Sequence, residues 1–98
     1  MAHIEIIGDG LCPIYIVLER ADGETVIQGV FMAEADAIEC CKNILQAFID
    51  NKWDFASILV VEEWDLNHSI HCELAMFCVS HNRIKESYYG SMRKANKE

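Results

Sequence analysis

The alternation of apolar and polar positions predicts a β-hairpin over residues 14–31. Two apolar-rich segments flank the dipeptide Asp22-Gly23. Asp-Gly favours a two-residue type I′ turn, because both central positions of that turn need positive φ. With the turn there, side chains of one parity face the core on both strands. The pairs expected on this core face are Leu18 with Ile27, Ile16 with Gly29, and Ile14 with Phe31.

Apolar residues then recur every three or four positions, which predicts an amphipathic helix from about residue 33 to residue 50. The expected apolar stripe consists of Ile38, Cys41, Leu45 and Phe48, widened by Ala37 and Ile44. Glu34, Asp36 and Glu39 lie on the outer side, and acids in the opening turns suit the helix dipole. Asn51 is expected to end the helix in a left-handed conformation.

A buried strand is predicted for residues 58–64, because four consecutive apolar residues are typical of a strand covered on both faces. Glu62 and Glu63 then mark the point where we expect the strand to emerge into solvent. A right-handed crossover would place this strand beside residues 14–20 and give it the direction of the second hairpin strand. A short strand over residues 3–7 could take that place instead.

The C-terminal part predicts a helix from residue 69 to about 94. Its apolar positions follow steps of four and three over three heptads, a 3.5-residue spacing. The residues with this spacing are Ile70, Leu74, Phe77, His81, Ile84, Tyr88 and Ser91. A competing interpretation is a strand over residues 70–79, a turn over residues 80–82 and a shorter helix.

The fold class that follows is α+β, in a single domain over residues 1–98. Its 98 residues, 52% of them hydrophobic, suffice for one core. We expect an antiparallel sheet, made of the hairpin plus one or two further strands, with the amphipathic helix covering it. The core should occupy about residues 3–66, and the C-terminal helical extension about residues 69–95.

The net charge of −8 is unevenly distributed. Residues 1–76 contain fourteen acids and three bases, which argues against direct nucleic-acid binding, since phosphate contacts need clustered Lys and Arg. The acidic surface is instead expected to contact a protein partner with a basic surface. The residues predicted to make this contact are Glu34, Asp36, Glu39, Glu62, Glu63 and Asp65.

The chain contains no apolar run near the ~20 residues that a membrane span needs, and its first residues do not have the pattern of a signal peptide. Five cysteines, an odd number without the spacing of a disulfide framework, indicate reduced thiols. We therefore expect a cytoplasmic protein that does not bind membranes.

One cluster has the residue types of a metal site, although the main expectation is that no metal or other cofactor is bound. Zinc prefers four nitrogen and sulfur ligands in tetrahedral geometry. The candidate ligands are His68, His71, Cys72, Cys78 and His81. On a helix, His68 and Cys72 would share a face, whereas Cys78 and His81 would lie ~9–13 Å farther along the axis. A metal- or thiol-dependent regulator is therefore the alternative function.

The motifs GVFMAEADA and VVEEWDL, within residues 14–66, resemble a loose group of small uncharacterised α/β proteins of phages and bacteria. This resemblance implies a compact accessory domain that binds and does not catalyse. We find no catalytic motif and expect a non-enzymatic inhibitor or regulator, in concrete form a phage-type anti-defence protein of the anti-CRISPR kind. If phage-encoded, it would act in the cytosol of the host cell.

A homodimer through the C-terminal helix is compatible with this function. The distal half of that helix is longer than a core of this size can cover, so its apolar side needs another surface. The residues predicted at the dimer interface are Phe77, His81, Ile84, Tyr88 and Met92.

Overall fold

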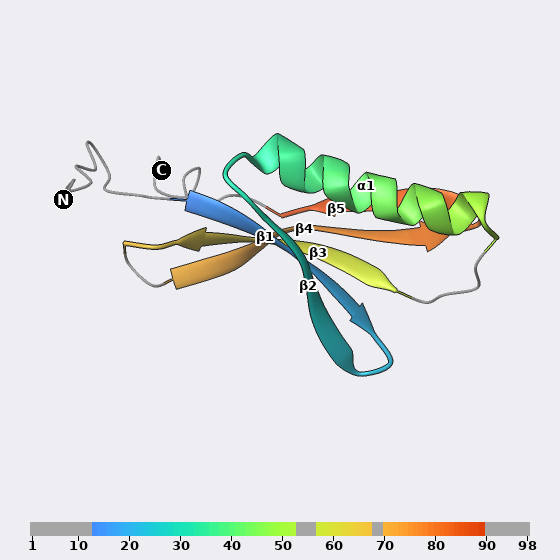
Figure 1. Cartoon of the computed structure of the whole chain (residues 1–98), viewed down its shortest axis with the longest axis horizontal. Coiled ribbons are helices and arrows are strands. Elements are labelled where there is room, and N and C mark those ends of the chain that lie inside the picture. The colour runs from blue at the N-terminus through green and yellow to red at the C-terminus, as the bar shows by residue number, and fades with distance from the viewer. Residues whose placement is uncertain (1–12, 53–56, 68–69, 90–98) are drawn as a thin grey trace.

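The computed structural model of the chain describes residues 13–52, 57–67 and 70–89, and within them it shows five strands and one helix (Figure 1). The elements are β1 (Pro13–Ala21), β2 (Glu24–Phe31), α1 (Glu34–Asp50), β3 (Ile58–Asp65), β4 (Ile70–Ser80) and β5 (Arg83–Tyr88). The strands form one antiparallel sheet in the order β2-β1-β3-β4-β5. The helix α1 packs along one side of this sheet (Figure 1). The predicted α+β class, with an amphipathic helix covering an antiparallel sheet, is confirmed, but the sheet has three strands besides the hairpin and not the expected one or two.

The turn of the β1–β2 hairpin forms at the predicted dipeptide. Asp22 and Gly23 have φ values of 53° and 79°, as a type I′ turn requires. Leu18 pairs with Ile27, as expected. A β-bulge then shifts the register by one residue, so that Ile16 pairs with Val30 and Tyr15 with Phe31. The predicted pairs of Ile16 with Gly29 and of Ile14 with Phe31 are therefore wrong.

The helix α1 covers the side of β1 opposite to the one predicted. Tyr15 and Val17 are buried in the core, and their partners across the strand pair are Phe31 and Gly29. The residues predicted for the core face, Ile14, Ile16 and Leu18, have the opposite parity, lie on the other face of the sheet, and are half-buried. We call this other face the open face, because the helix covers only the face with Tyr15 and Val17 and no other described element covers the open face.

The apolar stripe predicted for the helix is confirmed. Ala37, Cys41 and Leu45 are fully buried against the sheet. The side chains packed around them are Ile38, Cys40, Ile44 and Phe48. The end of the helix differs from the expectation by one residue, since Asn51 has a φ of −92° and Lys52 has the left-handed φ of 56°. The Asn51 side chain instead donates a 2.8 Å hydrogen bond from Nδ2 to the carbonyl of Ala47.

The strand β3 lies beside β1 and has the same direction as β2, as predicted, since both are antiparallel to β1. It does not emerge into solvent at the predicted point. Glu62 is 9% exposed and Glu63 is completely buried. The reason is that β4 pairs with the second edge of β3 over residues 58–65, so β3 lies between two neighbouring strands along its whole length.

The predicted C-terminal helix is wrong, because residues 70–88 form β4, a two-residue turn and β5. The strand and turn of the competing interpretation are confirmed, whereas its shorter helix is not present within the described residues. His81 and Asn82 form the turn with φ values of 53° and 63°. A strand buried on both faces still needs hydrogen-bonding neighbours at both edges, and β4 supplies the second neighbour of β3. Pairing between strands that are distant in the sequence produces no periodic pattern within either strand.

The predicted strand over residues 3–7 and the predicted helical residues after position 89, Met92 among them, lie outside the described residues. In the described part of the chain, no helix has the length and apolar character to cross a membrane.

Candidate protein-binding surface

The outer strand β2 is the most exposed apolar element among the described residues. It pairs with β1 on one side, and no described strand lies on its other side. Its sequence from Thr25 to Phe31 contains no charged residue. Large apolar side chains that remain exposed on or directly after it are Val26 (52%), Ile27 (62%), Val30 (58%) and Met32 (79%). Val26 lies on the helix face of the strand and Ile27 and Val30 lie on the open face, and no described strand pairs with the outer backbone edge between them.

The opposite edge of the sheet, β5, has a different composition. Arg83, Lys85 and Glu86 place three charges on a strand of six residues. Glu86 lies 3.4 Å from the ammonium of Lys42 on α1. Charged side chains on a short edge strand discourage pairing with another chain. Of the two edges, β5 has this protection and β2 lacks it.

A groove of about 430 Å³ lies between β2 and α1. Its lining residues are Phe31, Asp36, Glu39, Cys40, Asn43 and Ile44, and we call it the outer groove. The ring of Phe31 and the side chain of Ile44 are half-buried, whereas Asp36 and Glu39 are exposed. The outer groove therefore combines an apolar lining with two solvated carboxylates.

Gly29 makes the position of the Phe31 ring possible. A Cβ atom built on Gly29 would lie 2.7 Å from Cε2 and 2.9 Å from Cζ of Phe31. The ring thus lies directly over the glycine backbone, at a distance that no other residue type allows. Gly29 matters here through the space it leaves for its neighbour.

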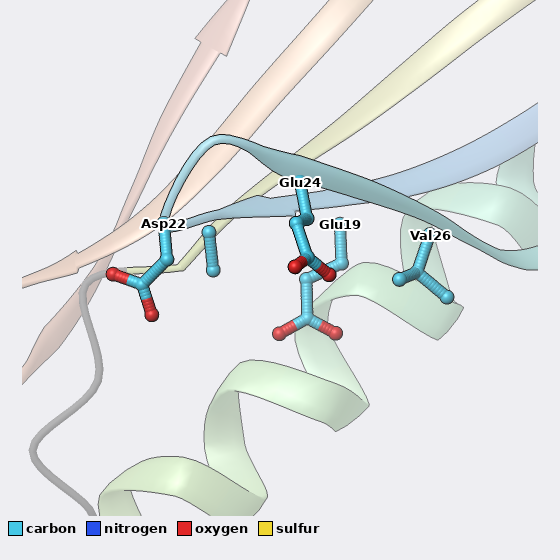
Figure 2. A pocket seen from close by; sticks show the side chains of 5 residues that line it. Glu19, Asp22, Glu24 and Val26 are labelled. Atoms are coloured by element: carbon cyan, nitrogen blue, oxygen red, sulfur yellow. The ribbon is translucent and has the colours of Figure 1, made fainter.

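A second hollow, of about 280 Å³, lies at the turn end of the hairpin (Figure 2). Its lining residues are Glu19, Ala21, Asp22, Glu24 and Val26, and we call it the hairpin hollow. Figure 2 shows the carboxylates of Glu19, Asp22 and Glu24 on the side of the hairpin that faces the helix. Glu19 is held by hydrogen bonds of 2.7 Å from Gln28 Nε2 and 2.7 Å from Ser57 Oγ.

The excess negative charge lies on the helix side of the sheet. The helix α1 carries four acids, Glu34, Asp36, Glu39 and Asp50, and one base, Lys42. The parity of the strand pairs assigns five charged residues to the open face, and there the two signs are nearly balanced. The residues are Arg20, Arg83 and Lys85 with Glu62 and Glu73. Arg20 lies 3.7 Å from Glu62 and 3.2 Å from Glu73, so part of this charge is paired internally.

No family model matches the chain, and no curated protein or solved structure matches it either. The functional assignment therefore depends on the surface of the molecule itself.

The predicted acidic contact surface divides into two sets. Asp36 and Glu39 are exposed and Glu34 is half-buried on α1, so they can reach a partner. Glu62, Glu63 and Asp65 are buried, Asp65 at 1% exposure, and their assignment to an exposed acidic surface is wrong.

All three buried carboxylates have hydrogen-bond donors close by, and Asp65 Oδ1 accepts a 3.0 Å hydrogen bond from the backbone N–H of Asn67. Glu63 accepts a 3.2 Å hydrogen bond from the hydroxyl of Tyr15, and Glu62 accepts one of 2.9 Å from Trp64 Nε1. Buried carboxylates need such donors to offset the loss of hydration. The alternating parity of a central strand, which places Glu62 and Glu63 on opposite faces, could have indicated that they do not form one acidic edge.

Three of the residues predicted for the dimer interface, Phe77, Ile84 and Tyr88, lie on the face of the sheet that α1 covers. Phe77 is fully buried beneath α1 and contacts Tyr88 edge-to-face with ring centroids 5.8 Å apart. Ile84 packs against the same core, and His81 lies in the turn between β4 and β5. The Tyr88 hydroxyl donates a 2.6 Å hydrogen bond to Glu86, which raises the pKa of Tyr88 to about 12. The helix predicted to form this interface is wrong over residues 70–88, which form β4, a turn and β5, whereas Met92 lies outside the described residues.

The His/Cys cluster is not brought together either. His71 and Cys72 are adjacent on β4 and point to opposite faces. Cys78 is six residues after Cys72, which corresponds to roughly 20 Å along a strand. The His71 ring stacks on Trp64 at 4.2 Å, and His68 lies outside the described residues. No three potential ligands gather at a metal-binding distance in the described ranges.

The adjacent cysteines Cys40 and Cys41 on α1 do not have the properties of a reactive thiol site. Burial raises the pKa of the Cys40 thiol. Burial also raises the pKa of Cys41 to about 12, with the neighbouring Cys40 adding to the effect. A reactive cysteine needs a lowered pKa.

Proposed function

We propose that the protein is a small acidic, non-enzymatic binding module that inhibits or regulates a larger protein by direct contact. The observation that supports this proposal is the position of two acid-lined hollows beside an exposed apolar strand. Contiguous apolar surface with a polar rim is characteristic of protein-binding sites. The carboxylates around it favour a basic partner and repel phosphates. The outer groove and the hairpin hollow together with β2 are thus the proposed contact surface.

The concrete form of this proposal comes from the sequence resemblance to phage and bacterial accessory proteins. Proteins that hold nucleic acid present clustered Lys and Arg, and an acidic protein can compete for that surface. An inhibitor of a host defence complex, of the anti-CRISPR kind, would act in this way. This form of the proposal is tested by measuring CRISPR interference in cells that express the wild-type protein or the outer-groove variant Glu39→Lys.

The variant Glu39→Lys tests the contact surface, with Asp50→Lys as its matched control. Both residues are exposed acids of α1, and each substitution changes the net charge equally, but Asp50 does not line the outer groove. We expect Glu39→Lys to lose capture of the partner and inhibition of its activity, while Asp50→Lys retains both. Binding should also weaken as salt concentration rises, because exposed charges are screened. Equal capture by both variants would contradict the proposed contact.

A further inference from the structure

We propose that the protein binds its partner by β-augmentation, in which an extended basic segment of the partner pairs with the outer edge of β2. This inference depends on the proposed function and specifies how the contact is made. The partner segment would become an additional strand beside β2, with main-chain hydrogen bonds supplying affinity and the hollows supplying side-chain selectivity.

The backbone of β2 is suited to this pairing. Its inner edge pairs with β1, and no described strand uses its outer edge. The strand has eight residues, against six in β5, and carries no charge between Thr25 and Phe31. The bulge at Gln28 divides the outer edge into residues 24–27 and 29–31. Glu24 and Val26 of the first part line the hairpin hollow, and Phe31 of the second part lines the outer groove.

The side chains define the chemistry of the partner segment. Successive residues of an added strand point to opposite faces of the sheet. On the open face they would contact Ile27 and Val30, which favours apolar residues. On the helix face they would enter the outer groove, where Phe31 lies beside the carboxylates of Asp36 and Glu39. Lys or Arg fits there, because an aliphatic stem can pack on the apolar lining while the cationic head stays solvated beside the acids.

A second copy of this chain is a poorer occupant of the edge. Antiparallel pairing of two β2 strands by a two-fold axis would place both α1 helices on the same side of the joined sheet. Asp36 and Glu39, which line the groove next to β2, would then face their own copies. Each chain also has a net charge of −8. Like charges placed opposite each other oppose association, whereas a basic segment is attracted.

The probe for the experiment is an eight-residue peptide that alternates lysine and valine, acetylated and amidated at its ends. Its affinity is measured by calorimetry for the wild-type protein, Glu39→Lys, Val30→Lys and Leu66→Lys. Val30 and Leu66 are equally exposed, at 58% and 57%, but Leu66 follows β3 and is not part of the β2 edge. Circular dichroism verifies that each variant is folded, which is expected for substitutions at exposed positions.

We expect Glu39→Lys and Val30→Lys each to raise the dissociation constant of the peptide by about tenfold or more. Leu66→Lys should stay within about twofold of the wild type, as surface substitutions away from a site do. Amide hydrogen exchange should slow in β2 when the peptide binds and should remain unchanged in β5. A peptide N-methylated at alternate residues keeps the charges but loses backbone donors, and it should bind much more weakly.

The outcomes separate the two proposals. If Glu39→Lys weakens binding but Val30→Lys does not, or β2 amides gain no protection, the acidic contact stands and β-augmentation is wrong. Absence of binding between the wild-type protein and the peptide also overturns β-augmentation, while the partner capture described above still tests the proposed function. If light scattering shows a wild-type dimer that Val30→Lys dissociates, the edge belongs to a second copy and the inference is wrong.

Discussion

The ring of Phe31 over Gly29 gives a prediction whose sign depends on the structure, for the variant Gly29→Ala. Gly29 does not have a positive φ, so alanine is compatible with its backbone conformation. A compatible Gly→Ala substitution stabilises a protein by about 0.4–1 kcal/mol, because it restricts the unfolded chain. Considered from the backbone alone, the variant should therefore be more stable than the wild type.

The packing predicts the opposite result. The new Cβ would lie 2.7 Å from Cε2 of Phe31, whereas carbon atoms prefer separations of about 3.5 Å or more. The ring would have to withdraw by about 0.8 Å to restore such a separation. Phe31 is half-buried against the core beneath α1, which restricts that movement. Overpacking of this kind costs about 1–3 kcal/mol, so we expect a net destabilisation of about 1–2 kcal/mol after the backbone gain.

Urea unfolding followed by tryptophan fluorescence measures this free energy, with an unchanged m-value showing that the compactness of the two states is preserved. The matched background is Phe31→Leu, which removes Cε2 and Cζ and therefore the close contact. In that background Gly29→Ala should become stabilising, with a coupling free energy of about 1–3 kcal/mol between the two positions. If Gly29→Ala is as stable as the wild type, or more stable, the ring does not pack over Gly29 and the reasoning is refuted.

Three further predictions concern the second turn and the core. Asn82→Gly should raise the free energy of unfolding by about 0.5–1 kcal/mol in a thermal melt, because glycine adopts the φ of 63° without strain; a loss of stability would show that Asn82 is not strained at this φ. Cys41 should resist alkylation in the native protein at pH 8 and react after unfolding, as read by peptide mass spectrometry. Rapid alkylation of the native protein would contradict the burial of Cys41. Because burial raises the pKa of the Cys41 thiol from 9.0 to about 12, the contribution of this thiol to stability should be complete below about pH 9 and be lost as the pH rises towards 12. Tyr15→Phe should lower the free energy of unfolding by about 1–3 kcal/mol in urea, since it removes a hydrogen-bond donor from the buried Glu63, and a neutral result would show that this bond contributes little.

The candidate surface was only partly predictable from the sequence. The outer acids Asp36 and Glu39 follow from the periodicity of the helix, and their exposure agrees with it. Their position beside Phe31 could not be predicted, because a groove depends on how α1 is placed against β2. The absence of charge from Thr25 to Phe31 was visible in the sequence. That this strand lies at an edge depends on the order of the strands in the sheet.

Local signals in the sequence determined three parts of the fold: the turn at Asp22-Gly23, the helix that covers the sheet, and the buried strand that follows it. Each is encoded within a few neighbouring residues, as positive φ, helical spacing or a continuous apolar run. Tertiary structure alone decided the bulge at Gln28, the face of the hairpin that packs on α1, and the strands over residues 70–88. All three arise from contacts between distant segments, since a central strand needs a neighbour at each edge and a sheet accommodates its register to the helix that covers it.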